Sequence, residues 1–129
     1  MKPLHWIASS KKDVLAFPEE VRSEVGYTLY LAQMGDKGLN AVPMVGFGSA
    51  KVLEVVIDDT GDTYRAVYTV KFQRAVYVLH AFQKKSKSGV ATPQPELNLI
   101  RSRLKLAEEH YKKNHERTGQ KERHNDRRA

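Results

Sequence analysis

The chain has 129 residues, which is enough for one domain with one hydrophobic core and too few for two ordinary domains. It contains no cysteine, so a disulfide framework and cysteine-based zinc sites are excluded. Lys and Arg total 22 against 15 Asp and Glu, a net charge of +7. Such a balance is typical either of a protein with a polyanionic partner such as nucleic acid or of one whose charge serves only solubility.

The chain opens without a charged segment followed by an apolar run, and no apolar run approaches the roughly 20 residues that span a bilayer. We therefore expect a soluble, cytoplasmic protein without membrane contact.

Three elements are predicted in the first 35 residues. Residues 4–8 are a short β-prone run and predict a strand. Ser10 and Asp13 have the spacing of a capping box, which predicts a helical turn over residues 11–16. A longer helix begins near Pro18, with acids in its first turn, and ends at Gly35. Its predicted buried face consists of Val21, Val25, Thr28, Leu29 and Ala32.

Residues 35–50 form a glycine-rich stretch that lacks both the G-x-G-x-x-G and the G-x-x-x-x-G-K-[ST] phosphate-binding patterns. We interpret this stretch as a long connection held down by a few apolar side chains. Residues 51–57 are then predicted to form a strand, and residues 58–62 a turn.

The rest of the chain is organised around residues 63–93. Two runs rich in Val, Tyr and Thr, residues 64–71 and 75–83, flank a polar break at Gln73 and Arg74, which is typical of a β-hairpin. Together with the preceding run they predict three consecutive antiparallel strands over residues 51–83. A helix anywhere between Tyr64 and Gln83 would contradict this interpretation.

A basic loop with Lys84, Lys85 and Lys87 follows the hairpin. Thr92 is a candidate cap for a last helix that runs to about Lys113. Its apolar stripe is predicted to be Leu97, Ile100, Leu104, Ala107 and Tyr111. We expect residues 1–113 to form one domain and residues 114–129, which contain no large apolar residue, to be a basic tail that is disordered in the free protein.

Cleavage of RNA without a metal needs a base for the ribose 2′-hydroxyl, cations for the phosphorane-like transition state and an acid for the leaving 5′-oxygen. Arg65, His80 and the lysines of the basic loop supply these chemical types on one hairpin. Each also has a structural interpretation. Arg65 can pair with Glu54 across the sheet, His80 can be a satisfied core histidine, and lysines commonly protect sheet edges from aggregation.

A metal site is not predicted. His110 and His115 are five residues apart, which does not place them on one helix face, and no second histidine stands near His5 or His80 in the sequence. The turn at residues 58–62 lacks the remaining ligands of a calcium loop. We therefore expect no metal and no cofactor.

Several of these motifs together resemble the RelE/ParE toxin superfamily, and most closely its phage-derived, HigB-like branch. The likeness is carried by Tyr64-Arg65-Ala66-Val67-Tyr68, by residues 78–85 (VLHAFQKK), by Thr92-Pro93 and by a helix with Arg101 and Arg103, and it spans most of residues 1–113. The resemblance implies a RelE-like α+β fold. In that fold an N-terminal helical hairpin packs on one face of a small, twisted antiparallel sheet, a C-terminal helix follows, and a concave surface remains open. The short connections between the predicted strands favour the same antiparallel sheet, with helices on one face.

The resemblance also implies a function, that of a type II toxin–antitoxin toxin. Such toxins enter the ribosomal A site and cut mRNA there by metal-independent general acid–base chemistry, which inhibits translation. The implied partners are the ribosome, mRNA and a cognate antitoxin, expected to be a helix-turn-helix protein encoded nearby. Arg65 matches an arginine at the start of the penultimate strand, and Lys85 matches a basic residue after the last strand. We predict as catalytic residues Arg65, His80, Lys84 and Lys85, and as RNA-binding residues Lys87, Arg101 and Arg103.

One departure from the pattern lies on the strand before the hairpin, where Glu54 and valines stand in place of further basic residues. Two other hypotheses therefore stay open. One is a non-enzymatic toxin of the same fold that poisons DNA gyrase, as ParE-like members do. The other is a phage-derived binding protein without catalytic activity.

Overall fold

The structure is a computed structural model, and it describes residues 1–38, 40–84 and 92–116. None of the helices in these ranges is both long and apolar enough to cross a membrane. In chain order the elements are β1 (Leu4–Trp6), α1 (Ser10–Leu15), α2 (Glu19–Gln33), β2 (Ala41–Pro43), a 3-10 turn (Gly48–Ala50), β3 (Val52–Asp59), β4 (Asp62–Thr69), β5 (Val76–Lys84), α3 (Gln94–Tyr111) and a π-helical turn (Lys112–Glu116).

The strands form one sheet in the order β1-β5-β4-β3-β2. The pairs β2–β3, β3–β4 and β4–β5 are antiparallel, which confirms the three consecutive antiparallel strands predicted over residues 51–83. The strand β1 lies beside β5 and is parallel to it, with Leu4 opposite Val76 and Trp6 opposite Val78. The sheet is therefore mixed.

The predicted fold class, an antiparallel sheet with an N-terminal helical hairpin on one face, is wrong. The chain begins with β1 at one edge and then passes through the six-residue α1 and the longer α2 to β2 at the other edge. A strand's side-chain alternation is the same whether its neighbour is parallel or antiparallel, so local pattern could not reveal the pairing of β1 with a strand about 70 residues later.

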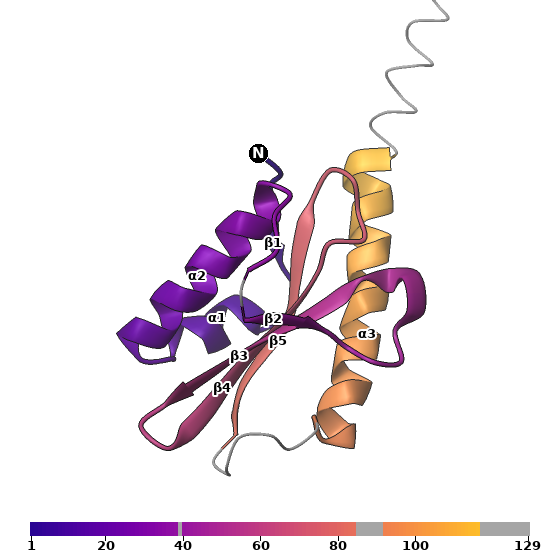
Figure 1. Cartoon of the computed structure of the whole chain (residues 1–129). Coiled ribbons are helices and arrows are strands. Elements are labelled where there is room, and N and C mark those ends of the chain that lie inside the picture. The colour runs from indigo at the N-terminus through magenta and orange to yellow at the C-terminus, as the bar shows by residue number, and fades with distance from the viewer. Residues whose placement is uncertain (39, 85–91, 117–129) are drawn as a thin grey trace, which may run out of the picture.

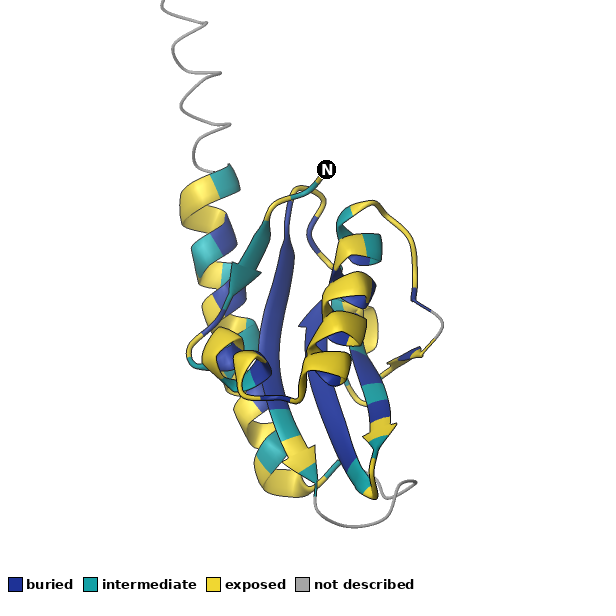
Figure 2. Ribbon diagram, turned by 90° about the vertical axis from the view of Figure 1, so that its left-hand side faces the viewer, coloured by how far each residue is buried: buried dark blue, intermediate teal, exposed yellow. Residues whose placement is uncertain are grey.

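Helices cover both faces of the sheet (Figure 1). The helices α1 and α2 pack against one face, in a core that contains Val55, Ala66 and Val78. The helix α3 packs against the other face, where its Ile100 meets Val67 and other strand residues. Figure 2 shows the central strands buried between helices whose outer surfaces are exposed. The face that we expected to be open is thus largely covered by α3.

The helix α2 follows the predicted pattern. Glu19 and Glu20 stand in its first turn, where the helix dipole favours acids. Val21, Val25 and Leu29 are all buried on its inner face, and Gly35 has the positive φ of 89° that allows the chain to leave the helix. The helical stripe read from the sequence is therefore confirmed here.

Two helix starts differ from prediction. In α1 the Ser10 hydroxyl donates to the carbonyl of Val78, and the hydroxyl of Ser9 contacts the carboxylate of Asp13, so the expected capping box is absent. In α3 the cap position is Pro93, and the hydroxyl of Thr92 donates to a side chain on β3 instead. Both differences arise because tertiary hydrogen bonds take over the hydroxyl groups.

Candidate functional site

A layer of polar side chains lies between the sheet and the N-terminal half of α3, at the end of β5 from which the basic loop leaves. These residues come from β3, β4, β5, the residue Thr92 before α3, and α3 itself. We name this set the polar layer, and it consists of Glu54, Arg65, His80, Thr92, Glu96 and Arg103.

Arg65 forms a buried ion pair with Glu54. The side chains of Arg65 and Glu54 are 5% and 8% exposed, and Nη1 of Arg65 lies 3.2 Å from Oε1 of Glu54. Thr92 completes a triangle, since it accepts from Nη1 of Arg65 at 3.1 Å and donates to Oε2 of Glu54 at 2.9 Å. Buried charges are tolerated only with such partners. The structural interpretation of Arg65 is therefore confirmed, and its catalytic role remains a prediction.

His80 is buried between two charged side chains of α3. Its Nε2 contacts the carboxylate of Glu96, and its Nδ1 lies 3.0 Å from Nη1 of Arg103. A guanidinium can only donate, so Nδ1 of His80 must accept and Nε2 must carry the proton that is donated to Glu96. The ring also stacks on Phe82, with centroids 5.1 Å apart. His80 is thus a satisfied histidine that contacts the partly exposed Glu96, whose side chain is 31% exposed.

A β-bulge gives His80 this orientation. Val67 of β4 pairs with His80, and the next residue, Tyr68, pairs with Val78, so Leu79 is an extra residue in β5. The extra residue keeps both Leu79 and His80 on the side of the sheet that α3 covers, where Leu79 joins the core and His80 meets Arg103.

The two arginines of α3, Arg101 and Arg103, contact different parts of the protein. Arg103 is half-buried and donates to the carbonyl of Leu79 at 3.1 Å and to the hydroxyl of Ser9 at 3.2 Å, which ties α3 to β5 and to the start of α1. Arg101 is exposed, donates to the carbonyl of Gly46 at 3.2 Å and stacks over the ring of Phe47 at 4.7 Å. Residues two apart on a helix do not share a face, so only Arg103 joins the polar layer.

The lysines predicted for the site lie at or beyond the end of β5. Lys84 is its last residue, half-buried and paired in register with Thr63. Lys85 and Lys87 lie outside the described residues. Sequence reasoning missed the roles of Glu96 and Thr92. The acid in the first turn of a helix and the hydroxyl before a proline both have ordinary local explanations, so neither signalled a site.

A second cluster of titratable groups joins the two ends of the described chain. Nε2 of His5 lies 3.1 Å from Nε2 of His115, and Nδ1 of His110 lies 2.5 Å from the hydroxyl of Tyr77. The ring of His5 is 4.8 Å from that of His110 and 5.3 Å from that of His115. His5 has no histidine near it in the sequence, but the fold brings His110 and His115 next to it, because β1 lies beside β5 near the C-terminal end of α3.

Burial is the main cause of the pKa shifts in this histidine cluster. It lowers the pKa of His5 from 6.5, and the charges of His110 and His115 lower it further. Burial likewise lowers the pKa of His115, with added effects from His110 and Arg74. Within residues 1–38, 40–84 and 92–116, no group of three or more His, Asp or Glu side chains has an arrangement that could hold a metal ion.

Comparison with known families identifies the chain at the level of a family. Residues 12–105 match the family model described as Phage derived protein Gp49-like (DUF891), and this range contains every member of the polar layer. No curated protein and no solved structure matches the chain. The match covers well over half of the sequence. The chain therefore belongs to the Gp49-like family of phage-derived proteins, a family of RelE-like toxins of toxin–antitoxin systems.

Proposed function

We propose that this protein is the toxin of a type II toxin–antitoxin system, of the HigB-like branch, and that it acts as a ribosome-dependent endoribonuclease. It cuts mRNA and so inhibits translation in the cytoplasm, where its partners are the ribosome, mRNA and a cognate antitoxin. Membership in a family of RelE-like toxins and the net charge of +7 support this proposal.

The observation that carries the proposal is the contact of His80 with Glu96. A partly exposed carboxylate bonded to a buried imidazole is an arrangement that can take up and release a proton at one point on the surface. In RNA cleavage such a base accepts the proton of the ribose 2′-hydroxyl, and the 2′-oxygen bonds to phosphorus. The bond from phosphorus to the 5′-oxygen then breaks, and that oxygen takes up a proton. The products are a 2′,3′-cyclic phosphate and a 5′-hydroxyl.

Cations of the polar layer and of the basic loop supply the charge stabilisation in this proposal. Arg103 holds His80 from its Nδ1 side, and Arg65 lies on the same face of the sheet. For Arg65 to fork onto a phosphate, phosphate oxygens must replace the carboxylate of Glu54 or the hydroxyl of Thr92. Lys84 and Lys85 complete the proposed catalytic set, and the proposed RNA-binding residues are Lys87, Arg101 and Arg103.

A non-enzymatic protein is the second candidate, either a ParE-like gyrase poison or a phage-derived binding protein without catalytic activity. The observation that favours it is the buried pair of Arg65 and Glu54, which gives the arginine a structural role that needs no substrate. In that case the polar layer only fixes α3 on the sheet.

The experiment that separates these candidates uses Glu96→Gln, which keeps the shape of the side chain but removes its capacity to accept a proton. Each protein is added to a purified translation system, and mRNA ends are mapped by primer extension. We expect Glu96→Gln to lower the cleavage rate by roughly 10²–10³-fold. Glu109→Gln, an exposed residue of the same helix, serves as the matched control and should cut at the wild-type rate. Equal cleavage by both variants would remove Glu96 and His80 from the mechanism.

A further inference from the structure

A groove with an apolar floor and a basic rim lies beside the start of β3 and the segment after β4. Its volume is about 480 Å³. The C-terminal end of α2, the strand β2, the start of β3 and the segment after β4 all contribute to it. The floor includes Ala32, Met44, Leu53 and Val70.

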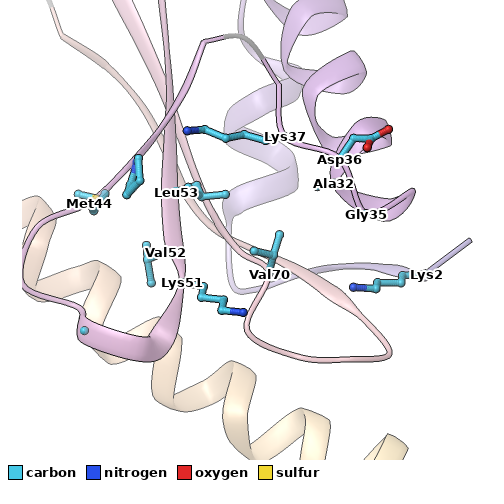
Figure 3. A pocket seen from close by; sticks show the side chains of 12 residues that line it. Lys2, Ala32, Gly35, Asp36, Lys37, Met44, Lys51, Val52, Leu53 and Val70 are labelled. Atoms are coloured by element: carbon cyan, nitrogen blue, oxygen red, sulfur yellow. The ribbon is translucent and has the colours of Figure 1, made fainter.

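Three lysines from separate segments surround this floor. Lys2 precedes β1, Lys37 follows α2 and Lys51 precedes β3. Figure 3 shows the side chains of Lys2 and Lys51 reaching toward each other from opposite sides, with Lys37 on the far side of Leu53. Lys2 is held in place by its backbone, which exchanges hydrogen bonds with Gln33 at 3.1 and 2.7 Å.

The positive charge of this rim is not compensated by the described part of the chain. Asp36 is the only acid that lines the groove, and none of the three lysines takes part in an ion pair among the described residues. A second hollow of about 420 Å³ shares Lys2 and Gly35 with the groove and adds Met34 and Arg74. The two adjoining hollows together are lined by four cations, Lys2, Lys37, Lys51 and Arg74.

The shape and chemistry of this surface fit a peptide better than a nucleic acid. Single-stranded nucleic acids bind by stacking bases on aromatic rings, and no aromatic side chain is found among the described residues that line either hollow. The floor offers aliphatic side chains instead, among them Met44, Leu53 and Val70. Such side chains favour an apolar partner surface, and the lysines favour acidic groups around it.

We propose that this groove is the docking site for an acidic segment of a protein partner, which places apolar side chains over Met44, Leu53 and Val70 and carboxylates against Lys2, Lys37 and Lys51. That the partner is the antitoxin rests on the proposed function. Leu53 of the groove is next to Glu54 of the polar layer in β3, but successive side chains of a strand point to opposite faces of the sheet. Leu53 and Val70 pack with the core under α1 and α2, whereas Met44 packs with the core under α3. A partner segment over Leu53 and Val70 therefore lies on the opposite face of the sheet from Arg65 and His80 and does not occupy the polar layer.

The test uses the full chain and, as the probe, the protein encoded by the adjoining gene, with affinity measured by calorimetry. The variant Lys37→Glu/Lys51→Glu reverses two exposed rim charges, and Lys11→Glu/Lys12→Glu reverses two exposed charges on α1 with the same change in net charge. We expect the groove variant to bind roughly 100-fold more weakly, because two attractions become repulsions, and the α1 variant to bind nearly as wild type. A third variant, Met44→Lys, tests the apolar floor and should also weaken binding.

Equal affinity of the groove and α1 variants, or no binding by the wild type, would overturn the inference. Expression of each variant alone provides the second measurement. The groove variant and the α1 variant should both still arrest growth, because neither changes a residue of the polar layer. Loss of growth arrest in the groove variant, with its thermal melt unchanged, would mean that the groove belongs to the toxic activity and not to a regulatory partner. Binding through the groove by a chain that cuts no RNA would refute the nuclease function while leaving the docking site intact.

Discussion

Replacing Arg65 with Met while Glu54 stays in place should lower the free energy of unfolding by about 3–5 kcal/mol. Both side chains are almost fully buried, and their nearest polar atoms are 3.2 Å apart. Two unit charges roughly 4 Å apart attract by about 4 kcal/mol at an effective dielectric constant of 20. Without Arg65 the carboxylate of Glu54 stays buried with the hydroxyl of Thr92 as a remaining donor. A loss of this size is a large part of the 5–15 kcal/mol that stabilises a typical domain.

The double variant Arg65→Met/Glu54→Leu should recover most of this loss. It removes the stranded carboxylate and fills the space with apolar side chains, and such replacements of buried pairs are often neutral or stabilising. We expect its free energy of unfolding to lie within about 2 kcal/mol of the wild type. The coupling between the two positions is therefore predicted to be several kcal/mol.

The assay is urea unfolding of the wild type, both single variants and the double variant, followed by circular dichroism. The exposed pair Lys71–Glu108, with side chains 36% and 42% exposed and 2.8 Å between the charged atoms, supplies a control cycle that should give at most about 1 kcal/mol. A coupling energy for Arg65 and Glu54 as small as that of the control would refute the reasoning.

The same double variant separates structure from catalysis. If Arg65 contacts the scissile phosphate, the refolded double variant should cut message about 10²–10³-fold more slowly than the wild type. Full growth arrest by the double variant would leave Arg65 with a purely structural role.

Three further predictions concern other parts of the chain. Thr60 has a φ of 52° in the tight turn between β3 and β4, a conformation that is strained for a β-branched residue, so Thr60→Gly should raise the free energy of unfolding by about 1 kcal/mol in urea denaturation. The hydroxyl of Tyr68 is buried without a hydrogen-bond partner among the described residues, so Tyr68→Phe should leave the melting temperature unchanged or raise it, and a clear decrease would contradict this. In the folded protein the pKa values of His5 and His115 lie below 6.5. The unfolded chain therefore binds more protons than the folded chain in mild acid. The free energy of unfolding should fall as the pH drops below about 6.5. Thermal melts of the wild type and of His5→Phe at pH values above and below about 6.5 test this prediction. The variant should lose less stability than the wild type as the pH falls, because it lacks the imidazole of His5.

The parts of the fold that could be predicted depend on neighbours in sequence. The stripe of α2 has clear helical periodicity and the runs of β4 and β5 have clear strand patterns, and all three elements formed where the pattern indicated. The apolar stripe of α3 was also correct, since Ile100, Ala107 and Tyr111 are buried. The amphipathic pattern of α3 does not indicate which face of the sheet the helix covers. The position of α3 determines whether Arg65 and His80 face solvent or a helix.

The candidate site was predictable in its residue types but not in its pairings. Arg65 on an apolar strand indicated a buried charge with a partner, and Glu54 was foreseen as that partner. Glu96 was missed because its contact with His80 depends on the position of α3 over the bulge at Leu79. The contact between His5 and His115 joins residues 110 positions apart, so only the tertiary structure could reveal it.

One measurement tests most directly whether this chain is a ribosome-dependent nuclease. The purified wild-type protein is added to one mRNA with and without translating ribosomes, and the ends of the mRNA are then mapped. We expect new mRNA ends inside the reading frame only where ribosomes are translating, with a 2′,3′-cyclic phosphate on the upstream fragment. Intact message under both conditions, together with growth arrest and broken chromosomal DNA in cells, would contradict it and favour a gyrase poison.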